Sequence, residues 1–135
     1  MQVQTLRKTA SSRKGISSLS MQLKALADPT RLAILELLMN GLQCNCNLGN
    51  RLGLPINLIS HHLKVLRGAG LVTFSRDEQD GRWIYYAIDA GGIASLKESL
   101  AAFLNPERIM NRPPVCGPQM AGPGGKTTTH HLQGV

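Results

Sequence analysis

The spacing of apolar side chains predicts a largely helical first half of the chain. Between residues 19 and 40, leucines and alanines recur every three or four positions on both sides of Asp28-Pro29. Aspartate is a favourable N-cap and proline a favourable first helical residue, so the pattern predicts two helices that meet at this point. A short helix over 48–52 and a longer one over 55–67 follow, and glycine comes directly after each.

The pattern changes after residue 70. Residues 71–76 and 82–88 are rich in β-branched and aromatic side chains, and Asp80-Gly81 lies between them. This combination predicts two strands joined as a hairpin. A last helix is expected over 92–104, where Ile93, Leu96, Leu100 and Phe103 share one face.

A helix, a short helix, a longer helix and a hairpin, in that order, form a winged helix-turn-helix. The predicted fold class is therefore mainly α with a β-hairpin wing (α+β), and a small domain of this kind gains stability as a homodimer. We expect a DNA-binding and dimerisation domain over 19–104. Residues 1–18 are basic and form either an arm or a first helix, whereas residues 105–135, rich in Pro and Gly, are expected to be a flexible tail.

The second helix of such a unit lies in the major groove of DNA. Over 56–67, Ile56, Ile59, Leu63 and Leu66 fall on one face, which we expect to be buried. The opposite face is polar and basic, and the hairpin adds two arginines that reach phosphate or the minor groove. The candidate DNA-binding residues are Asn57, Ser60, His61, Lys64, Arg67, Arg76 and Arg82.

Net charge supports a polyanionic partner. The chain has 15 Lys and Arg against 8 Asp and Glu, a net charge of +7. Nucleic acid is the first expectation and an anionic membrane surface the second. No apolar run reaches the ~20 residues that span a membrane, and the first 20 residues lack the apolar centre of a secretory signal. We therefore expect a cytoplasmic protein that does not insert into a membrane.

Three cysteines are the candidate chemical site. Cys44 and Cys46 flank Asn45, and Cys116 lies in the tail. A disulfide between residues two apart closes a strained ring, so reduced thiols are favoured. On a regular helix the two side chains point about 200° apart, which places the pair in a loop or requires the helix start to unwind. Asn45 or Asn47 is the expected N-cap of the short helix. The N-terminus of that helix lowers the pKa of a nearby thiol and so favours the thiolate form.

Three stretches of the chain resemble one known family. The runs KALADPTRLAILELL (24–38), ISHHLKVLRGAGL (59–71) and GRWIYY (81–86) are similar to those of the ArsR/SmtB metal-sensing repressors, over roughly residues 19–104. The resemblance implies a dimeric repressor that leaves an inverted-repeat DNA operator when an inducer binds. Two positions depart from the family: Ile56 replaces a polar residue at the start of the recognition helix, and Gly49 stands where many arsenic sensors have a third cysteine.

The resemblance also suggests the inducer. A Cys-x-Cys pair at this position is similar to the site of arsenic-responsive and of cadmium- or lead-responsive members. Thiolates without a nearby His or carboxylate suit soft, three-coordinate centres, so the sequence favours As(III), with Cys116 as the third metal ligand. Alternative inducers are Sb(III), methylarsenite, which needs only two thiols, Cd(II) and Pb(II). No constitutive cofactor is expected.

Other metal sites are less favoured. The family's zinc site uses Asp and His on the last helix, but 92–104 offers only Glu98. The tail histidines His130 and His131 are not expected to be ligands.

A redox sensor and a thiol enzyme are the alternatives to metal sensing. A redox sensor would pair oxidised Cys44 or Cys46 with Cys116. A thiol enzyme would need a His-acid pair to activate a cysteine, and the sequence places none, so no enzymatic activity is expected.

Overall fold

A computed structural model describes residues 2–118 of the chain, with side chains described from residue 13 onward. Residues 1 and 119–135 lie outside the described residues, and so do the predictions for His130 and His131. The chain divides into two compact units, Met1–Phe103 and Leu104–Val135.

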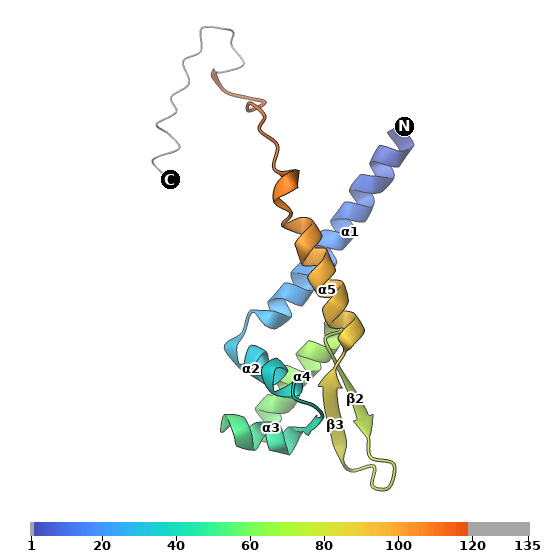
Figure 1. Ribbon diagram of the computed structural model, residues 1–135, viewed down its shortest axis with the longest axis vertical. Coiled ribbons are helices and arrows are strands. Elements are labelled where there is room, and N and C mark those ends of the chain that lie inside the picture. Colours follow the sequence, from blue (N-terminus) through green and yellow to red (C-terminus); the bar gives the residue numbers. More distant parts are fainter. Residues whose placement is uncertain (1, 119–135) are drawn as a thin grey trace. The chain divides into compact units, whose positions relative to one another are not determined.

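The first unit is a winged helix-turn-helix, as the sequence predicts. Figure 1 shows the described part of this unit as helices with a hairpin projecting at one end. Its elements are α1 (Gln2–Leu26), α2 (Pro29–Leu38), β1 (Gln43–Cys44), α3 (Asn45–Leu52), α4 (Ile56–Gly68), β2 (Val72–Arg76), β3 (Ile84–Ile88) and α5 (Ala90–Phe103).

The break between the first two helices is confirmed. Asp28 is in an extended conformation, and its side chain accepts a hydrogen bond of 3.0 Å from the backbone N–H of Arg31. Pro29 is the first residue of α2. The preceding helix is longer than the pattern predicts, because residues 2–18 are the first part of α1 itself.

The sheet has one strand more than predicted. All three strands are antiparallel, in the order β1-β3-β2. The hairpin registers Val72 with Ile88 and Arg76 with Ile84. The short strand β1 adds Cys44 opposite Tyr85, so the thiol segment is paired with the wing.

A core lies between α2, α3, α4 and the sheet. Its largest fully buried side chains are Ile34, Leu48, Ile59, Leu63, Leu66 and Leu71. Gly92 in α5 approaches the carbonyl oxygen of Gly70 so closely that a Cβ atom would overlap it. Glycine at this position therefore lets the start of α5 pack on the turn before β2.

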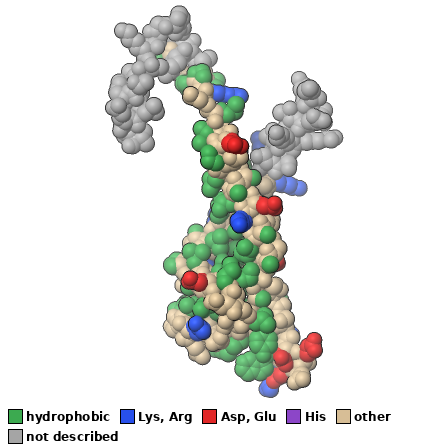
Figure 2. Space-filling model, in the orientation of Figure 1, with side chains coloured by type: hydrophobic (Ala, Val, Ile, Leu, Met, Phe, Trp, Pro, Cys, Tyr) green, Lys and Arg blue, Asp and Glu red, His purple; other side chains and the backbone are tan. Residues whose placement is uncertain are grey.

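Figure 2 shows hydrophobic side chains gathered along α5 and toward α2, with acidic side chains over the hairpin turn. Within the described residues no helix is both long and apolar enough to cross a membrane. The described part of the second unit, 104–118, contains one 3-10 turn, Pro106–Arg108, capped by the side chain of Asn105.

Candidate thiol site and nucleic-acid interface

Cys44 and Cys46 lie at the junction of β1 and α3, and their sulfur atoms are 2.8 Å apart. Both side chains are half-buried, and both cysteines are free thiols. The Cys44 sulfur also accepts the backbone N–H of Asn47 at 3.3 Å. The two sulfurs therefore face each other on one side of the chain.

This arrangement corrects the prediction for the helix start. The helix begins at Asn45 rather than at residue 48, and its N-cap is Cys44 instead of Asn45 or Asn47. Cys44 has φ −84° and ψ 160°, so it is extended and not helical. The angular separation expected of two residues on one helix does not apply across this boundary, and the sulfurs converge.

The two thiols differ in acidity. Partial burial raises the pKa of Cys44, but hydrogen bonds from the Cys46 thiol and from the Asn47 N–H outweigh it and leave that pKa below the usual value. The hydrogen bond to Cys44 raises the pKa of Cys46, and burial adds to this. Cys44 is therefore the more acidic thiol of the pair, and where one of the two is ionised this order favours Cys44 as the acceptor and Cys46 as the donor.

A third thiol at position 49 would be crowded by the neighbouring backbone. Gly49 is buried, and a Cβ atom there would lie 2.9 Å from the carbonyl oxygen of Leu54. Within the described residues, no group of three or more His, Cys, Asp or Glu side chains is placed to hold a metal ion. Cys116 is an exposed residue of the second unit.

The recognition helix α4 has the expected two faces, with one exception. Asn57, His61, Lys64 and Arg67 are exposed, whereas Ile59, Leu63 and Leu66 are buried. The prediction that Ile56 is buried was wrong: it is 48% exposed, because it is the first residue of α4 and only part of its side chain lies near Gly49.

Ser60 is half-buried and links α4 to the thiol segment. Its hydroxyl oxygen accepts a hydrogen bond of 3.3 Å from the side-chain amide of Asn45. Ser60 also lines a cleft of about 680 Å³ between α4 and the sheet, together with Lys64 and Arg67. The Arg67 guanidinium lies 4.0 Å from the centre of the Phe74 ring, which forms part of the same cleft. This basic cleft suits a phosphate backbone.

The two wing arginines are exposed but engaged within the hairpin. Arg76 donates to the carbonyl oxygen of Gly81 at 2.8 Å. Arg82 donates twice to Asp80, at 3.0 and 2.9 Å, and this contact holds the pKa of Asp80 below its usual range. The hairpin connection is also longer than the predicted Asp80-Gly81 turn, since the Asp77 N–H bonds the Trp83 carbonyl. The two wing arginines are therefore less available for contacts with DNA than the sequence suggests.

A network around Arg31 was missed at the sequence level. Arg31 donates to the carbonyl oxygens of Ala25 and Lys24 at the end of α1, at 2.6 and 3.3 Å. It also lies 3.1 Å from Nδ1 of His62, a buried residue of α4. Because arginine only donates, Nδ1 of His62 is the acceptor. The run that contains Asp28 and Arg31 was noted for its family likeness, but nothing in it indicated His62.

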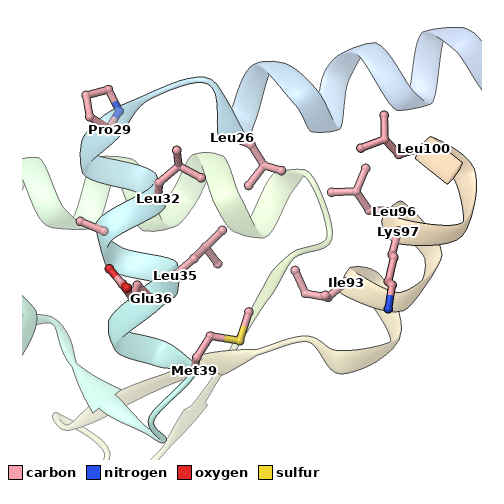
Figure 3. A pocket seen from close by; sticks show the side chains of 11 residues that line it. Leu26, Pro29, Leu32, Leu35, Glu36, Met39, Ile93, Leu96, Lys97 and Leu100 are labelled. Carbon is pink, nitrogen blue, oxygen red and sulfur yellow. The ribbon is translucent and has the colours of Figure 1, made fainter. Parts of the chain in front are cut away.

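An open apolar groove of about 870 Å³ lies between α2 and α5. Figure 3 shows Leu32, Leu35 and Met39 on one side and Ile93 and Leu96 on the other. Leu32 and Met39 are 51% and 60% exposed. This groove has no thiol in its lining and is separate from the site at Cys44 and Cys46.

Comparisons with known sequences agree with this architecture. The family model for bacterial regulatory proteins of the arsR family matches residues 28–73. An uncharacterised HTH-type transcriptional regulator of Methanocaldococcus jannaschii is 46% identical over 68 residues, which are 49% of this chain and 73% of that protein. The cadmium resistance transcriptional regulatory protein CadC homolog of Staphylococcus aureus is 31% identical over 87 residues. These residues are 64% of this chain and 68% of that protein. The chain spans about half the length of the mycobacterial regulators CmtR (52%) and SmtB (47%).

A solved structure is similar as well. A possible transcriptional regulator for arsenical resistance is 40% identical, with a TM-score of 0.56. The match covers 64% of this chain and 86% of that one.

Proposed function

The chain belongs to the arsR family of bacterial regulatory proteins and is a DNA-binding transcriptional regulator, and from this premise we propose that trivalent arsenic is its inducer. In this proposal a homodimer represses transcription from an inverted-repeat operator. Arsenic binds the sulfurs of Cys44 and Cys46, with Cys116 as third ligand, and the dimer leaves the DNA. The cytoplasm is the compartment that keeps the thiols reduced.

The observation that carries the proposal is the sulfur pair at the N-cap of α3. For metal–sulfur bonds of about 2.3 Å and bond angles of about 90 to 110°, two ligand sulfurs lie roughly 3.3 to 3.8 Å apart. The present separation is 2.8 Å. An incoming ion therefore finds both sulfurs on one side and has to spread them by roughly 0.5 to 1 Å.

That movement has a route to the DNA-reading elements. Cys44 pairs with Tyr85 of the wing strand, and its neighbour Asn45 bonds Ser60 of the recognition helix. A change in the first turn of α3 therefore displaces residues that contact both elements. To reverse a 99:1 population of bound over free protein, the inducer has to favour the released form by about 5.5 kcal/mol.

Ligand chemistry favours a soft, thiophilic centre. The pair presents sulfur alone, which disfavours hard cations. Arsenite, As(OH)₃, loses two hydroxyl groups as water when it forms two As–S bonds, and a third when Cys116 joins. Methylarsenite has two exchangeable positions and needs only the pair. A similar structure is that of a possible regulator for arsenical resistance, which supports this choice.

Cadmium or lead is the second candidate inducer. The S. aureus relative is a cadmium resistance regulator, and two or three thiolates also suit these ions. A redox response through Cys44, Cys46 and Cys116 is the remaining alternative. Titrations with cadmium and with peroxide distinguish these two alternatives from a response to arsenic.

On the DNA side, we propose that α4 reads the major groove through Asn57, Ser60 and His61. Lys64 and Arg67 contact phosphate or guanine, and the wing arginines Arg76 and Arg82 make secondary contacts. In a dimer the two α4 helices would lie about 34 Å apart, one turn of DNA.

The binding half of the proposal is tested without DNA. Arsenite is titrated into the reduced protein, and the thiols left reactive to a colorimetric reagent are counted. We expect three protected thiols in the wild type, two in Cys116→Ser, and loss of tight binding in Cys44→Ser and Cys46→Ser. Full reactivity of all three thiols at saturating arsenite would reject arsenic as the ligand. The same thiol count after addition of cadmium or of peroxide tests the two alternatives.

A further inference from the structure

Asn45 occupies a position that the thiol chemistry alone does not explain. It is the one residue between the two cysteines, and its side chain leaves the sulfur site toward α4. Its amide donates to the Ser60 hydroxyl across 15 positions of sequence. Within the described residues, this side-chain hydrogen bond directly joins the thiol segment to the recognition helix.

The bond restricts where the Ser60 proton can point. A hydroxyl has one O–H donor and two acceptor lone pairs. The Asn45 amide occupies a lone pair, so the O–H is left to donate elsewhere. Ser60 also lines the cleft with Lys64 and Arg67, where a phosphate or base acceptor of DNA would lie.

The bond is also placed to break when the sulfurs move. Its length, 3.3 Å, is near the upper end for a hydrogen bond. Asn45 is covalently joined to both cysteines, so any backbone adjustment that accompanies the spreading of their sulfurs by roughly 0.5 to 1 Å also moves Asn45. A shift of a few tenths of an ångström at its amide takes the bond beyond useful range.

We propose that Asn45 is the positioning residue that couples the thiol pair to operator binding: it orients the Ser60 hydroxyl for DNA, and inducer bound between Cys44 and Cys46 withdraws it. This inference rests on the proposed function and adds the residue that transmits it. Asn45 touches neither the inducer nor the DNA. Its effect therefore appears in the coupling between the two ligands.

The test compares operator affinity with and without arsenite, by anisotropy of a labelled duplex selected by the protein from random DNA. For Asn45→Ala we expect operator affinity to fall about 3- to 10-fold without arsenite, the range for one hydrogen bond. The ratio of operator affinities without and with arsenite falls by the same factor. Arsenite affinity of the DNA-free protein stays as in the wild type.

Asn47→Ala is the matched control, because Asn47 is the same residue type two positions on and its side chain bonds Gln43 rather than α4. It should leave all three quantities unchanged. In a double-mutant cycle, Asn45→Ala should have no further effect on operator affinity once Ser60 is replaced by alanine. Circular dichroism confirms that each variant is folded.

The outcomes separate the two claims. If arsenite does not bind the wild-type protein, or does not release it from the operator, the proposed function fails. If arsenite releases wild type and Asn45→Ala with the same ratio, the proposed function stands and the role of Asn45 is rejected. Additive effects of Asn45→Ala and Ser60→Ala would also reject it.

Discussion

Gly49 limits the thiol site at the level of a single residue. The resemblance to arsenic sensors predicts a third cysteine at this position, where the chain has glycine. Here α3 packs so closely on the segment after it that a Cβ atom at residue 49 meets the carbonyl oxygen of Leu54. The local site is therefore a two-thiol site by packing as well as by sequence.

We expect Gly49→Cys to disturb the fold instead of completing the site. Crowding of this kind costs about 1 to 3 kcal/mol of unfolding free energy, measured by urea denaturation of the reduced protein. Arsenite affinity should not increase. Asn50→Cys is the control, since residue 50 is exposed and accepts a thiol without crowding. Tighter arsenite binding by a Gly49→Cys variant of unchanged stability would contradict this account.

Proton balance at the thiol pair distinguishes arsenic from cadmium. Between the lowered pKa of Cys44 and the raised pKa of Cys46, the pair is one thiolate and one thiol. Cd(II) displaces the remaining proton, so its affinity should rise up to tenfold per pH unit. Arsenite leaves two waters and takes up one proton in forming two As–S bonds, so its affinity should fall as pH rises.

These slopes are measured by calorimetry over about pH 6 to 9, around the ordinary thiol pKa. Buffers of different ionisation enthalpy give the proton count independently. An arsenite affinity that rises with pH as cadmium's does would show that the thiolate assignment is wrong.

At the scale of elements, the sequence predicted what local rules control. Asp28-Pro29 marks a helix start because both residues act locally, and α4 and the hairpin follow from their periodicity. The strand β1 was missed because two residues have no period, and Cys44 is extended through pairing with Tyr85, which lies far along the chain. A cysteine N-cap was not expected either, since preferences favour the asparagines beside it.

The candidate site was predicted in its residues but not in its connections. Cys44, Cys46 and the exposed face of α4 could be named from spacing and resemblance. The Asn45–Ser60 and Arg31–His62 contacts depend on how α3 and α1 pack on α4. Ile56 was misplaced because periodicity does not show where a packed face ends.

The start of α2 should be acid-sensitive through Asp28. The backbone hydrogen bond from Arg31 lowers the pKa of Asp28, which means that folding favours its ionised form. Stability from this cap is present above the unfolded pKa, near 3.9, and is lost as pH falls through the lower folded pKa. We expect Asp28→Asn, which still caps the helix, to show a smaller fall in Tm between about pH 5 and 2 than the wild type. Equal falls in Tm would show that Asp28 does not contribute.

At the scale of the whole molecule, exposed apolar faces support dimerisation. Ile16 and Leu23 on α1 are 49% and 38% exposed and line a groove of about 310 Å³ that also includes Leu19. A second copy of the chain would remove these side chains from water. Each buried side chain of this size contributes about 1.5 to 3 kcal/mol.

In the proposed dimer, Ile16→Glu should therefore raise the dissociation constant about tenfold or more, because it puts a charge where the second copy would cover an apolar side chain. Sedimentation equilibrium measures this constant directly. Ser18→Glu adds the same charge on another side of α1 and should leave the dimer intact. Equal effects of both variants would show that charge, and not this face, controls association.

The central claim is that inducer bound at the cysteine pair releases the operator. It is tested most directly by titrating arsenite into the complex with fluorescently labelled operator and following anisotropy, for wild type and Cys44→Ser side by side. We predict equal operator affinity before arsenite is added, release of the wild type, and no release of the variant at the same concentrations. Release of both proteins at the same arsenite concentration would contradict the account.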